Sequence, residues 1–309
     1  MTNTHTAKGL IWVDLDSPTD EEIAYLVKRY NLHPLVGEEL KSSPSVAKID
    51  FYKDYVLVVL TLPERIQKNG RYIIVDREID FVIGKDFLIT SRSGAIEQLE
   101  YFAKIFETNV ILDREAKDKL EHAGHLFYYM VMRLYAGMVE DLRNIHDALS
   151  SAETRIFKGD ERSMVEVLSS LSRELIDFRQ TARVHREIWE DMIDFASKDF
   201  FGGDFGPYVK DLHDEFGRIH ELIANAHELV VDLRETNDSL LNTKQNDIIR
   251  TLTVVTFIFY PATFIAALFT IPAAYVPIID ERSGWMIILG SMIVIAIGIW
   301  LFVKRRRWL

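Results

Sequence analysis

The chain has 309 residues, a net charge of −11 and no cysteine, which excludes disulfides and thiolate metal sites. Its length predicts about two domains, enough for a substantial soluble core. Residues 251–309 carry five basic and two acidic side chains, which leaves a net charge of −14 on residues 1–250. Such a charge disfavours nucleic acid and anionic lipid as partners and attracts cations, although an acidic surface is also an ordinary solvated one.

The first part of the chain mixes strand and helix patterns, which predicts an α/β domain over residues 1–110. The polar opening residues do not resemble a signal peptide, so we expect the N-terminus to stay in the cytoplasm. Ser17-Pro18-Thr19-Asp20 predicts a helix start with a hydroxyl cap and a proline in the first turn. Short β-branched or aromatic runs between turn residues predict strands at residues 9–13, 55–62, 72–75, 79–83 and 87–90.

Beyond about residue 94 the pattern is helical, with an acidic helical region predicted over residues 111–206. The segment Gly202 to Pro207 interrupts it and places a proline where a new helix can begin. One stalk helix is then expected over residues 207–270, roughly 95 Å long at 1.5 Å per residue. Pro261 lies in it, inside an apolar stretch where a kinked helix can continue.

The stalk helix carries an apolar seam with alternating spacings of four and three residues. A repeat of 3.5 residues requires a partner helix along its length, either in the same subunit or in a neighbour. The seam consists of Leu212, Phe216, Ile219, Ile223, Ala226, Val230 and Leu233.

Two uncharged runs near the C-terminus, Thr251–Ile279 and Ser283–Val303, are each long enough to cross a bilayer as a helix. They predict a first span that ends the stalk, an external loop over residues 271–284 and a second span over residues 285–303. The tail, residues 304–309, is basic, and basic residues beside a span stay on the cytoplasmic side. We therefore expect an inner-membrane protein with both termini in the cytoplasm and a basic ring of Lys304, Arg305, Arg306 and Arg307.

One face of the first span and its approach is more polar than the rest. Hydroxyls and amides that face a symmetry axis can line a hydrated path, although the same residue types also join packed membrane helices. The candidate pore-lining residues are Asn246, Ile249, Thr253, Thr256, Tyr260 and Thr263.

Histidines occur in two groups. His122 and His125 could chelate a metal with Glu121, but an exposed helix surface is the expected setting. Three stalk histidines recur every seven residues, about 10.5 Å along a helix, so no two can bind one ion within a chain. Two interpretations remain open: the histidines of several subunits form rings in an oligomer, or they are polar residues that flank the seam. Each histidine is followed by an acid, in the pairs His213-Asp214, His220-Glu221 and His227-Glu228.

Enzyme signatures are missing from the sequence. It contains no glycine-rich dinucleotide loop, no phosphate-binding lysine loop, no His-Glu-x-x-His and no cysteine nucleophile. The chain is therefore not expected to be an enzyme or to bind an organic cofactor. One cluster of acids is interpreted as a solvated helix face: Glu187, Glu190, Asp191 and Asp194.

Several segments match the motifs of one family. Tyr260-Pro261 precedes Thr263-Phe264-Ile265-Ala266, and Tyr275-Val276-Pro277 leads toward the second span. Leu32 to Glu39 and Pro207 to Asp211 match further upstream. On these residues, and on its basic tail, the chain resembles the CorA family of divalent metal cation (magnesium) channels over nearly its whole length. The resemblance implies a funnel-shaped homopentamer with an α/β cytoplasmic domain, long helices and two C-terminal transmembrane helices.

The chain departs from this family at the outer mouth of the expected pore. Family members carry Gly-Met-Asn there, and its asparagine ring holds a hydrated Mg²⁺; this chain has Thr270, Ile271 and Pro272. Mg²⁺ prefers oxygen ligands, so the Thr270 hydroxyl could receive the hydrated ion. Pro272 has no N–H, so the Leu268 carbonyl loses its helical donor and could also face the ion.

The resemblance also implies regulation by intracellular Mg²⁺ bound between subunits. The matching acids are Glu39 and Asp211, and carboxylates suit Mg²⁺; the alternative is a pair of exposed acids. The expected function is a passive pentameric channel for divalent cations, with Mg²⁺ or another divalent cation as both transported and regulatory ion. Two alternatives are a Zn²⁺, Co²⁺ or Ni²⁺ transporter of the same architecture and a non-conducting pentameric scaffold or sensor.

Overall fold

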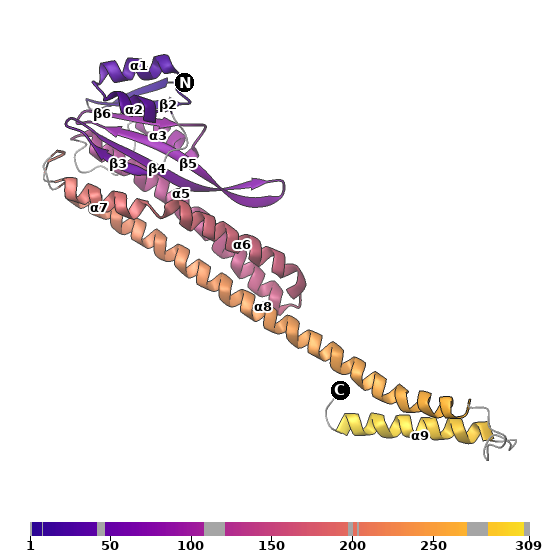
Figure 1. Cartoon of the computed structure of the whole chain (residues 1–309). Helices are drawn as coiled ribbons and strands as arrows, with labels where there is room; N and C mark the ends of the chain where they lie inside the picture. The colour runs from indigo at the N-terminus through magenta and orange to yellow at the C-terminus, as the bar shows by residue number, and fades with distance from the viewer. Residues whose placement is uncertain are drawn as a thin grey trace. The chain divides into compact units, whose positions relative to one another are not determined.

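The protein divides into two compact units, Met1–Arg234 and Glu235–Leu309. The long helix α8, Gly206–Leu268, contributes residues to both (Figure 1). The division thus falls inside the stalk helix rather than at residues 206 and 207, and the sequence-based domain limits stay predictions. The structure is a computed structural model that describes residues 2–7, 9–41, 47–107, 121–196, 200–202, 204–270 and 284–305.

A six-stranded sheet forms the first part of the N-terminal unit, with strand order β1-β2-β6-β5-β4-β3. Only β2 and β6 pair in parallel; the other neighbours are antiparallel. The strands are β1 Thr2–Ala7, β2 Leu10–Asp16, β3 Lys48–Phe51, β4 Val56–Lys68, β5 Arg71–Ile83 and β6 Phe87–Arg92.

The expected strands are present, with three differences. The predicted strands at 72–75 and 79–83 are one strand, β5, joined to β4 by a tight turn at Asn69 and Gly70. Both turn residues have positive φ, 53° and 77°, which suits a two-residue hairpin. Strand β1 was not predicted, because its polar residues lack the alternation of a half-buried strand. Strand β3 was not predicted either, and it has only four residues.

The first helix, α1 (Asp20–Arg29), begins two residues after Pro18. Thr19 is the cap: its hydroxyl accepts a hydrogen bond from the Glu22 amide, and its own amide donates to the Glu22 carboxylate at 2.9 Å, which completes a capping box. Pro18 therefore precedes the cap, and the prediction of a proline in the first turn is wrong. The reason is that Thr19 and Glu22 have the spacing of a capping box, whereas Ser17 does not reach the helix amides.

Helices cover both faces of the sheet. Helix α1 and the short helix α2 (Pro34–Glu39) pack on one face, where Val82 belongs to a core with Ile23 and Val36. The next residue along the strand, Phe81, faces the other side and meets Phe127 with 5.1 Å between ring centroids. That side is covered by helices α3 (Glu97–Glu107), α5 (Ala123–Phe157) and α6 (Glu161–Ala182) (Figure 1).

The apolar seam of α8 is buried within the N-terminal unit. All seven seam residues, from Leu212 to Leu233, are at most 6% exposed in the single chain. Of the two partners that the sequence left open, the same subunit therefore supplies the cover. Helix α7 (His185–Ala196) precedes α8, and its four acids Glu187, Glu190, Asp191 and Asp194 are exposed, as predicted.

The C-terminal unit contains the end of α8 and helix α9 (Gly284–Arg305). Both helices are long and apolar enough to cross a membrane. Helix α8 continues through Pro261 without a break, as expected for a proline in an apolar span.

Candidate ion pathway and candidate cation site

The predicted pore-lining residues are all exposed in the single chain, and Tyr260 is 72% exposed. Their threonine hydroxyls donate to carbonyls one turn earlier, from Thr253 to Ile249 at 2.8 Å and from Thr256 to Leu252 at 2.9 Å. Thr263 bonds in the same way to Phe259 at 3.0 Å. The donors are thus satisfied inside the helix, while the hydroxyl oxygens keep lone pairs that can accept hydrogen bonds from water.

A different face of α8 is the less exposed one in the C-terminal unit. Val254 is 3% exposed, and Ile258 and Ile265 continue its stripe. Helix α9 has a matching stripe that includes Met292 and Val303, and the two helices belong to one compact unit. At 100° per residue, the centre of the candidate pore face lies roughly 160° around the helix from this stripe. The polar positions therefore point away from the packed face.

The expected selectivity mouth is only partly described. The Thr270 hydroxyl donates to the Ala267 carbonyl at 2.7 Å, so its oxygen still has acceptor capacity. Ile271 and Pro272 lie outside the described residues, as do Arg306 and Arg307 of the predicted basic ring. Lys304 and Arg305 are exposed in the last turn of α9, and the Lys304 amine lies 4.9 Å from the centre of the Trp300 ring.

The two candidate regulatory acids contact different partners within one chain. Glu39, at the end of α2, pairs with Lys48 at 3.0 Å. Asp211, in the second turn of α8, accepts a hydrogen bond from the Tyr128 hydroxyl at 2.6 Å. Across the residues that the structure describes, no three His, Asp or Glu side chains form a group suited to a metal ion. Among the described residues of one chain, neither Glu39 nor Asp211 therefore belongs to such a group.

Sequence reasoning missed a buried acid beside Glu39. Asp80, on β5, is 4% exposed, and its Oδ1 atom has no hydrogen-bond partner in the described structure. Burial, followed by the charges of Glu78 and Glu39, raises the pKa of Asp80 to about 8. Asp80 and Arg92 both line a cavity of about 210 Å³. Arg92 forms a salt bridge with Asp14 at 3.0 Å. The available signal was an acid flanked by buried apolar residues in Ile79-Asp80-Phe81.

The sequence comparisons agree on one family. The family described as CorA-like Mg²⁺ transporter protein matches residues 7–305. The chain belongs to this family. Its relatives include the cobalt/magnesium transport protein CorA of Thermotoga maritima, 22% identical over 96% of this chain and 83% of the relative. The cobalt/magnesium transport protein CorA of Methanocaldococcus jannaschii is also 22% identical, over 96% of this chain and 90% of the relative.

Solved structures give the same fold. The complete structure of the CorA magnesium transporter from Methanocaldococcus jannaschii matches this chain with a TM-score of 0.80. The match covers 97% of this chain and 92% of the transporter chain. The full-length CmaX protein has a TM-score of 0.72 and covers 97% and 89%. Both are 20% identical to the chain. CorA-like proteins are transporters, in agreement with the missing enzyme signatures.

The histidines of this CorA-like chain differ in their surroundings. His213 and His227 are partly exposed and His220 is exposed, and the single chain brings no two of them together. His122 and His125 are buried and stacked, 4.1 Å between centroids, so the prediction of an exposed helix surface is wrong for them. The reason is an aromatic cluster that closes over both rings and contains Phe201, Phe205 and Tyr208.

The buried pair is not arranged to chelate a metal. His122 caps α5 by accepting a hydrogen bond from the Gly124 amide at 3.1 Å, which occupies its Nδ1 atom. Burial, the charge of His125 and other neighbours leave the pKa of His122 at about 4, so the ring is neutral at physiological pH. Its role in the CorA-like fold is to anchor the start of α5 to the residues before α8.

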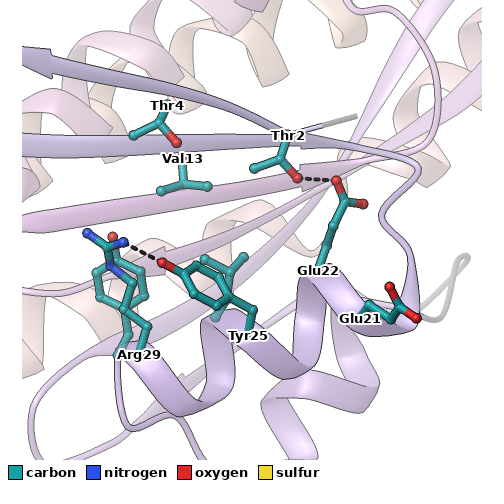
Figure 2. A pocket seen from close by; sticks show the side chains of 9 residues that line it. Thr2, Thr4, Val13, Glu21, Glu22, Tyr25 and Arg29 are labelled. Carbon is teal, nitrogen blue, oxygen red and sulfur yellow. Dashed lines mark hydrogen bonds between the residues drawn. The ribbon is translucent and has the colours of Figure 1, made fainter.

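A further pocket of about 340 Å³ lies between β1 and α1 (Figure 2). Arg29 donates to the Tyr25 hydroxyl at 2.6 Å, and the Thr2 hydroxyl donates to Glu22. Hydrogen bonds from the Thr19 backbone and from Thr2 lower the pKa of Glu22. Of these contacts, the bond from Thr2 to Glu22 ties the edge strand β1 to the helix α1.

Proposed function

We propose that the chain is one subunit of a homopentameric channel that passes divalent metal cations across the inner membrane, with Mg²⁺ as the first ion to test. Both termini lie in the cytoplasm, and the ions move passively down the membrane potential. The relatives support this proposal through their names, which record cobalt and magnesium transport. The acidic cytoplasmic part supports it through charge, because acids concentrate cations near an inner mouth.

The observation that carries the proposal is that α8 has two different faces in the C-terminal unit. One face is covered within the subunit, and the opposite face carries hydroxyls and an amide that remain exposed. Lipid disfavours such a polar face, whereas a hydrated axis between five copies satisfies it. In this arrangement the stripe at Val254 faces outward to α9, and Thr256 and Thr263 line the path.

Regulation is proposed at Glu39 of one subunit and Asp211 of its neighbour. A bound cation there would cross-link subunits and favour the closed pore, and its loss would restore repulsion between acids. Asp211→Lys should raise the internal Mg²⁺ concentration for half-inhibition by about tenfold or more, since a fixed positive charge replaces a ligand. Unchanged inhibition would count against this site.

The test is ion flux in liposomes that contain the purified full-length protein. Mg²⁺, Co²⁺, Ni²⁺, Zn²⁺ and a monovalent ion are compared across an imposed potential, with protein-free liposomes as the control. We expect uptake of Mg²⁺ that increases with an inside-negative potential. Uptake of Zn²⁺ or Ni²⁺ without Mg²⁺ would favour the alternative transporter, and no flux of any ion would favour the scaffold.

A further variant tests whether the residues at the outer mouth of the proposed pore limit ion flux. Replacing Thr270, Ile271 and Pro272 by Gly, Met and Asn restores the family signature without touching the candidate pore face. If the wild-type chain conducts weakly and this variant conducts Mg²⁺ strongly, the mouth alone limits flux. If neither conducts, the cause lies elsewhere and the channel proposal fails.

A further inference from the structure

The environment of Asp211 differs from that of a paired surface acid. Its side chain is exposed, and among the described residues no Lys or Arg lies within salt-bridge distance of it. Its hydrogen bond comes from the neutral Tyr128 hydroxyl, 2.6 Å from Oδ2. A neutral donor occupies one oxygen without cancelling the negative charge, so Oδ1 remains available to a cation or to the water around it.

Tyr128 is itself held in place. It lies on α5, next to Phe127, which is fully buried against Phe81 of the sheet. Its ring meets the ring of Tyr208 edge-on, 5.0 Å between centroids, and Tyr208 packs in turn on His125 at 4.7 Å. Because an ionised carboxylate can only accept a hydrogen bond, the Tyr128 hydroxyl is the donor in its contact with Asp211.

We propose that Tyr128 is a positioning residue for the cation site at Asp211: it fixes the carboxylate so that Oδ1 faces the neighbouring subunit. This inference rests on the proposed function, in which Asp211 binds a cytosolic divalent cation. Hydrated Mg²⁺ is bound through one or two carboxylates, and hydrogen bonds behind such ligands are commonly needed for full affinity. Without the bond, the exposed Asp211 side chain would lose rotamer freedom on binding the ion, which weakens binding.

The test compares three variants of the full-length protein in detergent. Tyr128→Phe removes the donor and keeps the ring. Tyr208→Phe is the matched control, because it removes a hydroxyl from the same aromatic cluster for which no hydrogen bond occurs in the described structure. Asp211→Asn removes the charge of the proposed ligand. The readout is the Mg²⁺ concentration that gives half of the maximal thermal stabilisation, which does not depend on conduction.

We expect Tyr128→Phe to raise this concentration about tenfold, the lower end of the range for loss of a hydrogen bond to a metal ligand. Tyr208→Phe should leave it unchanged, and Asp211→Asn should raise it further. The internal Mg²⁺ concentration for half-inhibition of flux should shift in the same order.

Two results would overturn the inference in distinguishable ways. If Asp211→Asn shifts the Mg²⁺ dependence and Tyr128→Phe does not, Tyr128 does not position the carboxylate, while the regulatory site itself stands. If neither variant shifts it, both the regulatory site and the positioning role fail. A Tyr128→Phe protein with a lower melting temperature but an unchanged Mg²⁺ dependence would show a structural role only.

Discussion

Along helix α8, apolar side chains before and after residue 235 differ in what covers them. In the N-terminal unit Phe216 and Val230 are almost completely buried by other parts of the same chain. In the C-terminal unit Leu252 is 65% exposed and Phe257 is 56% exposed. The N-terminal unit thus completes its core within the single chain, whereas the C-terminal unit leaves large apolar side chains exposed, as the proposed membrane channel requires.

The largest expected effect tests this difference in burial. Phe216→Ala should lower the free energy of unfolding by about 3–5 kcal/mol, because it leaves a cavity in the seam. Phe257→Ala is the matched control in the C-terminal unit and should change stability far less, because Phe257 is exposed. Thermal unfolding of both proteins in detergent measures the contrast. Equal losses of unfolding free energy in the two variants would contradict the claim that α8 is buried by its own chain before residue 235 and exposed after it.

A second prediction concerns Asp80, the buried acid of the N-terminal unit. The folded state keeps a proton on Asp80 up to about pH 8, and the unfolded state releases it near its ordinary value of 3.8. Between these values the folded state binds more protons, so this group lowers stability as pH rises. Asp80→Asn should therefore stabilise the protein at pH 7–8, by an amount on the order of a few kcal/mol, and have little effect near pH 4.

The check is the difference in melting temperature between wild type and Asp80→Asn from pH 5 to pH 8, with Asp50→Asn as the control. Asp50 is a partly exposed acid that pairs with Lys48 at 3.4 Å on the same side of the sheet. His185, whose pKa burial lowers to about 4, acts in the opposite direction, since its contribution is lost as pH falls below about 6.5. Because His185 is present in both proteins, its pH dependence cancels when the melting temperature of wild type is subtracted from that of Asp80→Asn. A difference that shrinks with rising pH would contradict the assignment.

The smallest effect contrasts two threonines. Thr19→Ala removes the capping box of α1 and should cost about 1 kcal/mol of stability without changing flux. Thr263→Ala removes a hydroxyl from the candidate pore face and should change flux with little effect on stability. Melting temperature and liposome flux, measured on both variants, separate the two roles. Equal effects of the two variants on flux would count against the candidate pore face.

Much of the architecture was predictable from local sequence patterns. The seam from Leu212 to Leu233 has a period of 3.5 residues, and the spans are long uncharged runs, so both were recognisable. The hairpin of β4 and β5 was split in the prediction because its outer residues are mostly exposed and lose the alternation of buried positions. Polar β1 was missed for the same reason.

The contacts around the candidate cation site at Asp211 were not predictable from the sequence. Tyr128 and Asp211 are 83 residues apart, and nothing in either local pattern pairs them. The burial of His122 and His125 depends on Phe201 and Phe205, which lie in an irregular segment before α8. Such contacts follow from the packing of distant segments, and a single sequence does not contain that information.

The central claim is that α8 turns one face to water and the opposite face to α9. Because the chain has no cysteine, single cysteines can be placed along α8 without other changes. In liposomes, a membrane-impermeant thiol reagent should label cysteines at Thr253, Thr256 and Thr263 and reduce flux. Cysteines at Val254, Ile258 and Ile265 should stay unlabelled. Labelling of the second set in preference to the first, or equal labelling of both, would contradict the proposed pore.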